Sequence, residues 1–394
     1  MRSPQGSFRL AGGVLPDEEV RFTPSGRRRG LAEAVLVEVV HPSNQRIYAD
    51  CPVAANCGGC TLQFVQPAYQ AQIKSDWVKR AFAAHMSSQT TWIPCKPAVL
   101  SQSRRRARYW CGVDEKGRFL GFRAPKSHKV IRHAHCMQVA PLIDSIRKTL
   151  ETSLPDHVKS VEITSLNNGI HVVFESDREF DVLGFVLEIN AQFWWRKKER
   201  LAPVSSEIQP LYDRLPAGES WIDVEVGPGD FVQGQKAGNI SILRQVQKWA
   251  EGSGRVADLF SGIGNLSLPL AALGRSVAGA EISPATVKNA NRNAMRLGVD
   301  ASYLVSDLFG RFDPEPFVGA DVLILDPPRR GAKNVCGMMN VLLPRSVIML
   351  HCDVEAGSRD ASALASYGYQ LQALRAIDLF AYTGHVEAMS LWQR

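Results

Sequence analysis

The C-terminal part of the chain alternates short apolar runs with amphipathic stretches, and this alternation restricts the fold more than any other sequence feature. Runs rich in Val, Leu and Ile begin after Phe231, and helix-like stretches such as 284–298 separate them. Strands that alternate with helices form a largely parallel sheet with helices on both faces. The pattern predicts a Rossmann-like, doubly wound α/β domain over residues 231–394. Its last strand, in HVEAMSLW, is expected to be antiparallel.

The N-terminal part has a different, β-rich character. Residues 1–50 contain Val- and Leu-rich runs between turn-like segments, which predicts a small β-barrel with the basic triplet 27–29 on a loop. An amphipathic helix is expected over 69–86, and mostly strands with one helix near 140–152 should follow. Three units are therefore expected, with the bounds 1–50, 51–230 and 231–394.

Composition limits the class of protein. The 394 residues are 45% hydrophobic and 22% charged, which suits a globular protein of two or three domains. A net charge of +7 is compatible with a polyanionic partner without indicating one by itself. No apolar run is long enough to span a membrane and no signal-like segment begins the chain, so a cytoplasmic location is expected. In a reducing cytosol the eight cysteines should be metal ligands, catalytic groups or core thiols rather than disulfides.

A glycine-containing turn follows the first predicted strand of the α/β region. In the run DLFSGIGN, Gly262 and Gly264 permit a tight turn and the close approach of a ligand. Glu281 ends the second strand, where an acid can accept hydrogen bonds from ribose hydroxyls, and Asp307 ends the third, where adenine would lie. Alone, these features also fit a nicotinamide cofactor or a plain tight connection. The spacing G-x-G-N, however, differs from the G-x-G-x-x-G of dinucleotide sites.

Three further residues should meet at the same edge of the sheet, beyond the carboxyl ends of its strands. Asp326 begins an Asp-Pro-Pro run after the fourth strand, Cys352 ends the fifth, and Glu387 begins the last. Taken singly, Cys352 and Glu387 are compatible with a buried strand-end thiol and a surface acid. Their expected juxtaposition with Asp326 favours a methyltransferase.

A thiolate and a carboxylate are the minimal set for methylating carbon 5 of uracil. The thiolate adds to carbon 6 and makes carbon 5 nucleophilic, and a base later removes the carbon 5 proton so that the thiolate can leave. Methylation of an exocyclic amine needs neither group, and its enzymes usually have an aromatic residue where this chain has Arg329 after Asp-Pro-Pro. A cytosine methyltransferase also uses a thiolate, but its cysteine follows the proline.

Four cysteines form a separate set with ligand-like spacing. Cys51, Cys57 and Cys60 are close in sequence, and Cys136 is much later. Four thiolates suit either zinc or an iron–sulfur cluster, and a three-plus-one arrangement favours the cluster. The expected role is structural or RNA-positioning, because radical chemistry would need an open iron position.

Two clusters place aromatic residues beside cations, a combination that suits looped or single-stranded RNA. Each is also compatible with a solvated charged surface next to core aromatics. Phe231 is a further candidate for base stacking near the pocket. The clusters are Arg104, Arg105, Arg106 and Arg108 with Tyr109 and Trp110, and Trp194 and Trp195 with Arg196, Lys197 and Lys198.

At these residues the sequence resembles the RNA 5-methyluridine methyltransferase family, and most closely the bacterial 23S rRNA uracil-C5 enzymes with an iron–sulfur cluster. The resemblance covers nearly the whole chain and rests on GDFVQGQ, DLFSGIGNLSLPLA, LDPPRRGA, LHCDVEAGSRD and HVEAMSLW. It implies that Cys352 is the nucleophile, that Glu387 is the base and that the four cysteines hold a [4Fe–4S] cluster. It also implies S-adenosylmethionine contacts from Gln233, Phe260, Asn265, Glu281, Asp307 and Asp326.

The resemblance further implies that residues 1–50 form a shortened RNA-binding TRAM barrel and that the helix over 69–90 packs on the catalytic domain. Two positions depart from the family pattern: Gln235 and Asp353 stand where Asn is more usual. The shortened front favours 23S rRNA over transfer RNA as the substrate. A tRNA 5-methyluridine methyltransferase and a non-catalytic iron–sulfur RNA-binding protein remain alternatives, and the latter predicts loss of Cys352 or Glu387. Protein partners are not predicted.

Overall fold

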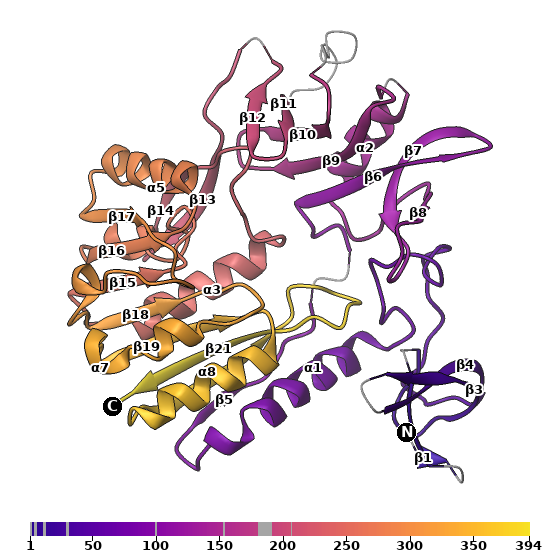
Figure 1. Ribbon diagram of the computed structural model, residues 1–394, viewed down its shortest axis with the longest axis horizontal. Helices are drawn as coiled ribbons and strands as arrows, with labels where there is room; N and C mark the ends of the chain where they lie inside the picture. Colours follow the sequence, from indigo (N-terminus) through magenta and orange to yellow (C-terminus); the bar gives the residue numbers. More distant parts are fainter. Residues whose placement is uncertain are drawn as a thin grey trace.

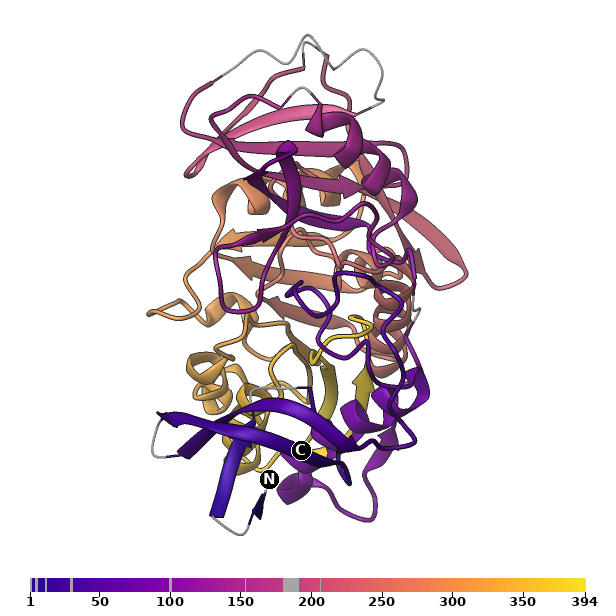
Figure 2. The same cartoon turned by 90° about the vertical axis from the view of Figure 1, so that its right-hand side faces the viewer.

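The computed structural model describes residues 2–3, 6–10, 13–28, 31–98, 101–152, 154–179, 191–205 and 207–394. These residues form three sheet-based units, visible as separate groups of strands in Figure 1. The N-terminal sheet and the central sheet lie at opposite ends of the molecule (Figure 2), and the C-terminal sheet lies to one side of both (Figure 1). No helix in the described part of the chain is both long enough and apolar enough to cross a membrane.

The C-terminal unit is an eight-stranded sheet in the order β17-β16-β15-β18-β19-β21-β20-β5. β21 runs antiparallel to both of its neighbours, and the other pairs are parallel. This confirms the predicted α/β class. The strands are β15 (Arg255–Leu259), β16 (Ser276–Glu281), β17 (Ala301–Val305), β18 (Val322–Leu325), β19 (Ser346–His351), β20 (Gln370–Ile377), β21 (Glu387–Gln393) and β5 (Thr91–Ile93).

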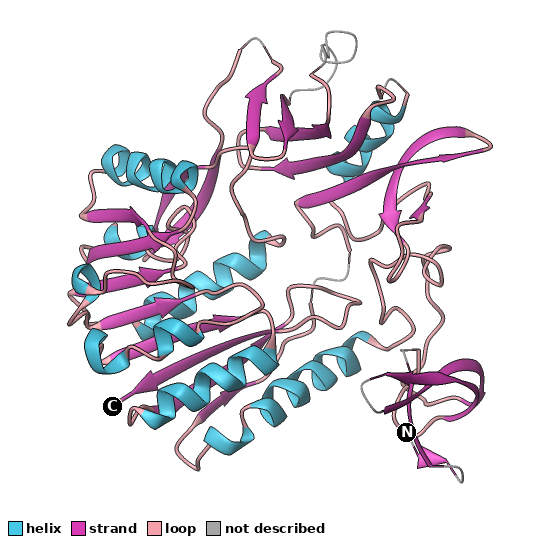
Figure 3. Cartoon of the chain, in the orientation of Figure 1, coloured by secondary structure: helices cyan, strands magenta, loops and turns pink. Residues whose placement is uncertain are grey.

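Helices cover both faces of this sheet (Figure 3). One core contains residues of α3 (Lys236–Trp249), α4 (Leu268–Ala271) and α5 (Pro284–Leu297). The other contains residues of α6 (Lys333–Cys336), α7 (Met339–Leu342) and α8 (Val354–Ser366). Local signals set their ends: in α5, Ser283 caps the first turn and Gly298 adopts a left-handed conformation after the last residue.

A segment from the N-terminal half completes this unit. Helix α1 (Pro67–Ala81) lies beside α8, and Val78 and Phe82 are buried in the second core. Strand β5 then pairs with β20 as the edge strand of the sheet. The single helix expected over 69–86 is therefore shorter, and a 3-10 turn at Ala83–His85 follows it.

The central unit is a seven-stranded mixed sheet in the order β12-β11-β10-β9-β6-β7-β8, with α2 (Pro141–Glu151) against it. The following hairpin of β13 (Tyr212–Ala217) and β14 (Ser220–Glu225) packs into the core that contains residues of α3, α4 and α5. It does so although it precedes Phe231 in the sequence. The strands are β6 (Arg106–Asp114), β7 (Gly117–Arg123), β8 (Val130–Ile131), β9 (Val158–Ser165), β10 (Ile170–Ser176), β11 (Gln192–Lys197) and β12 (Arg200–Pro203).

The N-terminal unit is a four-stranded sheet in the order β1-β2-β4-β3. Within the described residues this sheet is open, so the expected barrel closure is not seen. The expected basic loop is corrected: positions 27 and 28 belong to β3, and Arg29 lies outside the described residues. The strands are β1 (Arg2–Ser3), β2 (Gly6–Leu10), β3 (Glu19–Arg28) and β4 (Leu31–His41).

Candidate active site

The sheet brings the three predicted catalytic-edge residues together. Asp326 follows β18, Cys352 follows β19, and Glu387 is the first residue of β21. These strands are neighbours, and His351 is paired with Ala388. One further step in this antiparallel register sets Cys352 opposite Glu387. The antiparallel direction of β21 is what brings its first residue to the carboxyl edge of the parallel strands.

Electrostatics couple the three groups. Burial raises the pKa of Glu387 to about 7, and the Arg329 guanidinium opposes the rise. Burial also raises the pKa of Asp326 to about 7, with a further contribution from Glu387. The Cys352 thiol has its pKa raised to about 11 by burial and then by both carboxylates, while Arg329 pulls it down. A cation bound among these groups would lower all three pKa values.

The glycine turn after β15 is built around unusual backbone conformations. Phe260, Gly262 and Gly264 all have positive φ, at 69°, 55° and 81°. A non-glycine residue in this region is strained, and such strain is concentrated at functional sites. The amides of Phe260 and Ser261 both donate to the Ala280 carbonyl at 3.0 Å, which fixes the turn against β16.

Asp258, which has no role among the sequence predictions, is buried directly before this turn. The Ser267 hydroxyl donates to one Asp258 carboxylate oxygen at 2.5 Å and lies 2.9 Å from the Tyr303 hydroxyl. The other carboxylate oxygen is buried without a hydrogen-bond partner. Burial raises the pKa of Asp258 to about 7. Its position just before a glycine turn was the available signal.

The predicted cofactor residues surround the same turn. Glu281 accepts from the Gly262 amide at 3.3 Å and from the Ile282 amide at 2.7 Å. Asn265 exchanges two amide hydrogen bonds, at 2.9 and 3.0 Å, with Asn239 of α3. Asp307 is exposed after β17 and accepts from the Phe309 amide at 3.0 Å.

Gln233 reaches the turn from another direction, through the stretch before α3. Its carbonyl accepts from Arg105 Nε at 2.9 Å, and its side chain is half-buried. The Phe260 ring lies 5.2 Å from the Phe309 ring, and the Arg330 guanidinium stacks on Phe309. These five residues come from four separate segments of the chain: Gln233, the glycine turn with Phe260 and Asn265, Glu281 and Asp307.

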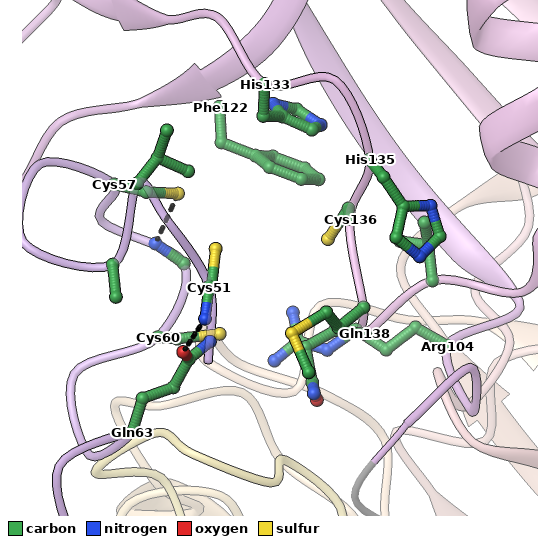
Figure 4. A pocket seen from close by; sticks show the side chains of 15 residues that line it. Cys51, Cys57, Cys60, Gln63, Arg104, Phe122, His133, His135, Cys136 and Gln138 are labelled. Atoms are coloured by element: carbon green, nitrogen blue, oxygen red, sulfur yellow. Dashed lines mark hydrogen bonds between the residues drawn. The ribbon is translucent and has the colours of Figure 1, made fainter. Parts of the chain in front are cut away.

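The four spaced cysteines line one cavity in the central unit (Figure 4). All four are free thiols. Burial raises the pKa of Cys57, Cys60 and Cys136, and Arg104 opposes the rise in each case. Among the described residues, no three His, Cys, Asp or Glu side chains are close enough together to hold a single metal ion. The thiols thus face a common space without converging on a point.

Comparison with known proteins identifies the family. The chain is 31% identical over 415 residues to the 23S rRNA (uracil(1939)-C(5))-methyltransferase RlmD of Shewanella sp. strain ANA-3, covering 99% of this chain and 91% of the relative. The protein of the same name from Pseudomonas aeruginosa strain PAO1 is 31% identical and covers 97% and 88%. This chain belongs to the family of 23S rRNA uracil-C5 methyltransferases. No protein-family model matches the sequence.

A solved structure supports the same fold for this methyltransferase. The tRNA (uracil-54, C5)-methyltransferase of Pyrococcus abyssi, solved with S-adenosyl-L-homocysteine, superimposes with a TM-score of 0.73. The two chains are 20% identical, and the match covers 94% of this enzyme and 91% of the archaeal protein. Central and catalytic units are therefore arranged alike in both.

The predicted RNA-contacting clusters are only partly correct. Arg105 is buried, and its guanidinium forms a two-pronged ion pair with Asp213 at 2.6 and 2.8 Å. Tyr109 and Trp195 are buried in the central unit. These three residues therefore stabilise the protein instead of facing RNA, because tertiary contacts buried part of each run.

Other members of these clusters remain at the surface. Arg108 and Arg123 both stack on the Trp110 ring. Phe231 is 64% exposed, with the Arg106 guanidinium 5.6 Å from its ring centre. These aromatic–cation pairs keep the chemistry expected of an RNA-contacting surface.

The two departures from the family pattern have simple local explanations. Asp353 caps α8 by accepting from the Ala356 amide at 2.9 Å, a role that Asn performs about equally well. Gln235 precedes α3 but makes no cap; its amide donates to the Ser103 hydroxyl at 3.0 Å. The Gln235 side chain thus contacts the segment before β6.

Proposed function

We propose that this enzyme transfers a methyl group from S-adenosylmethionine to carbon 5 of a uridine in 23S rRNA, with Cys352 as the nucleophile and Glu387 as the base. The observation that carries the proposal is the meeting of Asp326, Cys352 and Glu387 at one sheet edge. Names of relatives support the substrate, and position 1939 is the first uridine to test.

The chemistry follows from these groups. The Cys352 thiolate forms a bond to carbon 6, and the displaced electron pair makes carbon 5 nucleophilic. S-adenosylmethionine supplies an electrophilic methyl group on a sulfonium. Glu387 then takes the carbon 5 proton, the carbon 5–carbon 6 double bond re-forms, and the bond from carbon 6 to sulfur breaks.

The surroundings of the glycine turn fit this cofactor. Glu281 is suited to the ribose hydroxyls, and Asp307 and Phe260 to the adenine end. Asp326 is suited to the cationic end, where a positive charge would restore its ordinary acidity. Gln233 and Asn265 complete the set from either side of the turn.

A covalent trapping experiment tests the mechanism. The enzyme is incubated with S-adenosylmethionine and 5-fluorouridine-containing 23S rRNA or tRNA fragments. Because fluorine cannot leave as a proton does, we expect a stable protein–RNA adduct with the rRNA fragment and none with Cys352→Ala. An adduct with tRNA alone would assign the alternative substrate, and the absence of any adduct despite cofactor binding would reject the thiolate mechanism.

The four cysteines are proposed to hold a [4Fe–4S] cluster. The four thiols line one cavity, and their three-plus-one spacing along the chain favours a cluster over zinc. Anaerobic purification followed by iron, sulfide and zinc analysis tests this assignment. The expected result is that the protein contains iron and sulfide in equal amounts and that Cys136→Ala loses both. A protein that contains zinc alone would contradict the assignment.

We assign the remaining units to RNA binding. The N-terminal sheet is proposed to be the TRAM-like module, and the surface cations near Trp110 and Phe231 to contact the RNA backbone and bases. Deletion of residues 1–41 should weaken RNA binding while leaving S-adenosylmethionine binding intact, which calorimetry with each ligand can measure.

A further inference from the structure

The loop between β20 and β21 leads directly into Glu387, and it has an unusual conformation. Tyr382, in the middle of this loop, has a left-handed backbone with φ of 60°. A tyrosine does not adopt this conformation without support from its surroundings. Tyr382 lies five residues before Glu387, the first residue of β21.

Two hydrogen bonds from distant segments fix the Tyr382 backbone on both sides. The Tyr382 amide donates to the side-chain oxygen of Gln70 at 3.0 Å, and the Tyr382 carbonyl accepts from the Leu62 amide at 2.7 Å. Gln70 is buried, and its amide nitrogen is occupied by the Val65 carbonyl at 2.8 Å. Its oxygen is thus oriented toward the loop.

One turn further along α1, Lys74 holds the beginning of the same loop. Its ammonium group lies 2.7 Å from the Asp378 carboxylate and donates to the Phe380 carbonyl at 2.9 Å. The side chain of Lys74 is fully buried and that of Asp378 is 2% exposed. Removing one partner of a buried ion pair strongly destabilises a folded protein, because it leaves an uncompensated buried charge. Lys74 therefore holds the start of the loop firmly.

The loop also carries a residue that faces the catalytic edge. His385 Nε2 lies 3.5 Å from the Arg329 guanidinium, and Arg329 lowers the pKa of both Cys352 and Glu387. The loop therefore influences both the position of the proposed base and the cation next to it.

We propose that Gln70 and Lys74 of α1 are positioning residues for the base Glu387, acting through the loop 378–386. The proposal rests on the assignment of Glu387 as the base. Neither side chain touches the reacting atoms. Together they hold the loop at its first residue and at its strained middle, and so set the orientation in which Glu387 enters β21.

The order of the chemical steps gives this role a distinctive signature. Glu387 acts only after carbon 6 has bonded to sulfur and carbon 5 has received its methyl group. A displaced base slows removal of the carbon 5 proton, and the electron pair that would expel the thiolate stays in the carbon–hydrogen bond. The methylated RNA then remains attached to Cys352.

The test compares two variants that break the contacts with two that keep them. Gln70→Leu removes the acceptor for the Tyr382 amide. Gln70→Glu retains an oxygen acceptor there, and in its protonated form it can still donate to the Val65 carbonyl. Lys74→Met removes the charge, and Lys74→Arg retains it. Exposed residues of the same helix provide the controls Gln72→Leu and Lys79→Met.

With an ordinary uridine fragment, Gln70→Leu and Lys74→Met should accumulate denaturation-resistant protein–RNA complex. Their kcat should fall by about tenfold to a hundredfold with little change in KM, the scale expected for a displaced catalytic group. The rate of adduct formation with 5-fluorouridine RNA should stay within about twofold of the wild type, because that adduct does not require the base. Gln70→Glu should regain most of the activity.

Several results would overturn the proposal. A parallel loss of turnover and of 5-fluorouridine trapping would show that α1 serves the whole site, and unchanged turnover in Gln70→Leu would show that the loop needs no such support. Should Lys74→Met not fold, the Gln70 pair decides the question. Wild-type enzyme that traps no 5-fluorouridine RNA would instead reject the thiolate mechanism on which the proposal depends.

Discussion

Two regions of this protein place thiols in different electrostatic surroundings, although each contains an arginine that favours the thiolate. At the catalytic edge, Glu387 and Asp326 both raise the pKa of Cys352 beyond the effect of burial. In the four-cysteine cavity, Arg104 lowers the pKa of three thiols, against the effect of burial. Since a thiolate is both the nucleophile and the metal ligand, the same ionisation is opposed by neighbouring carboxylates in one place and assisted by a cation in the other.

This difference suggests how reactivity is restricted. A thiol with a pKa of about 11 is protonated at neutral pH and reacts slowly with oxidants or stray electrophiles. A positive charge bound beside Asp326 and Glu387 would favour the thiolate just when the methyl donor is present. A metal bound by the four cysteines would need no such timing, because the metal itself would displace the protons.

The largest effect should come from exchanging one thiol in each region. Cys352→Ala should lower methyl transfer at least about a thousandfold, since no other group can add to carbon 6. Cys136→Ala should release the metal while the Cys352 thiol remains. Radiolabelled methyl incorporation and metal content measure the two outcomes. Methylation by Cys352→Ala at more than a few per cent of the wild-type rate would contradict this difference between the two regions.

The pH dependence of turnover should reflect the carboxylates at the catalytic edge. Glu387 must be ionised to accept the carbon 5 proton, and its pKa is about 7 in the free enzyme. Where proton removal limits turnover, kcat should therefore rise about tenfold per pH unit below pH 7 and level off above it, because Cys352 is already bonded to carbon 6 at that step. Single-turnover assays between about pH 5 and 9 would show this. A flat profile from pH 5 to 7 would mean that the base has an ordinary acidity.

Replacing Glu387 should also stabilise the fold at alkaline pH. Its pKa is raised from 4.5 to about 7, so the native state holds the proton more tightly than the unfolded state does. The destabilisation is absent below about pH 4.5, grows as pH rises toward 7 and is complete above it. Glu387→Gln should therefore raise the free energy of unfolding at pH 8 by about 3 kcal/mol or less.

Denaturant unfolding of Glu387→Gln at pH 8 and at about pH 4 measures this difference, with exposed Glu355→Gln as the matched control. The gain should vanish at the lower pH. A gain that is equal at both pH values would come from packing, not from charge.

The smallest expected effect concerns the cation of the cysteine region. Arg104→Met should raise the pKa of the neighbouring thiols and speed metal loss to a chelator by about tenfold, the scale of substitutions around metal ligands. The effect should grow as pH falls, because protons then compete better for the thiolates. The control is Arg108→Met, which removes an exposed cation further along the chain. Equal loss rates for both variants would show that Arg104 has no influence on the site.

The sequence predicted those parts of the site that depend on local order along the chain. The glycine turn, Glu281 and the strand-end positions of Asp326 and Cys352 all follow from the regular alternation of strands and helices. The antiparallel last strand was expected from the type of sheet that this alternation implies. Such features need no knowledge of which distant segments meet.

Contacts between distant segments could not be predicted in this way. Arg105 stands in a basic run that resembles an exposed surface, yet it pairs with Asp213, 108 residues later. Gln70 lies 312 residues from Tyr382, and Lys74 lies 306 residues from Phe380. In a single sequence, nothing marks these side chains as partners, because burial and pairing are properties of the folded whole.

The early position of α1 and β5 in the chain has a consequence for how the protein is made. Helix α1 ends at Ala81, but its partners α8 and β20 begin at Val354 and Gln370. At about 5–20 residues per second, a ribosome reaches them roughly 14–58 s later. Until then Val78 and Phe82 lack their native cover. Helix α1 therefore waits for segments made long after it, and its buried side chains are covered only once α8 and β20 have been synthesised.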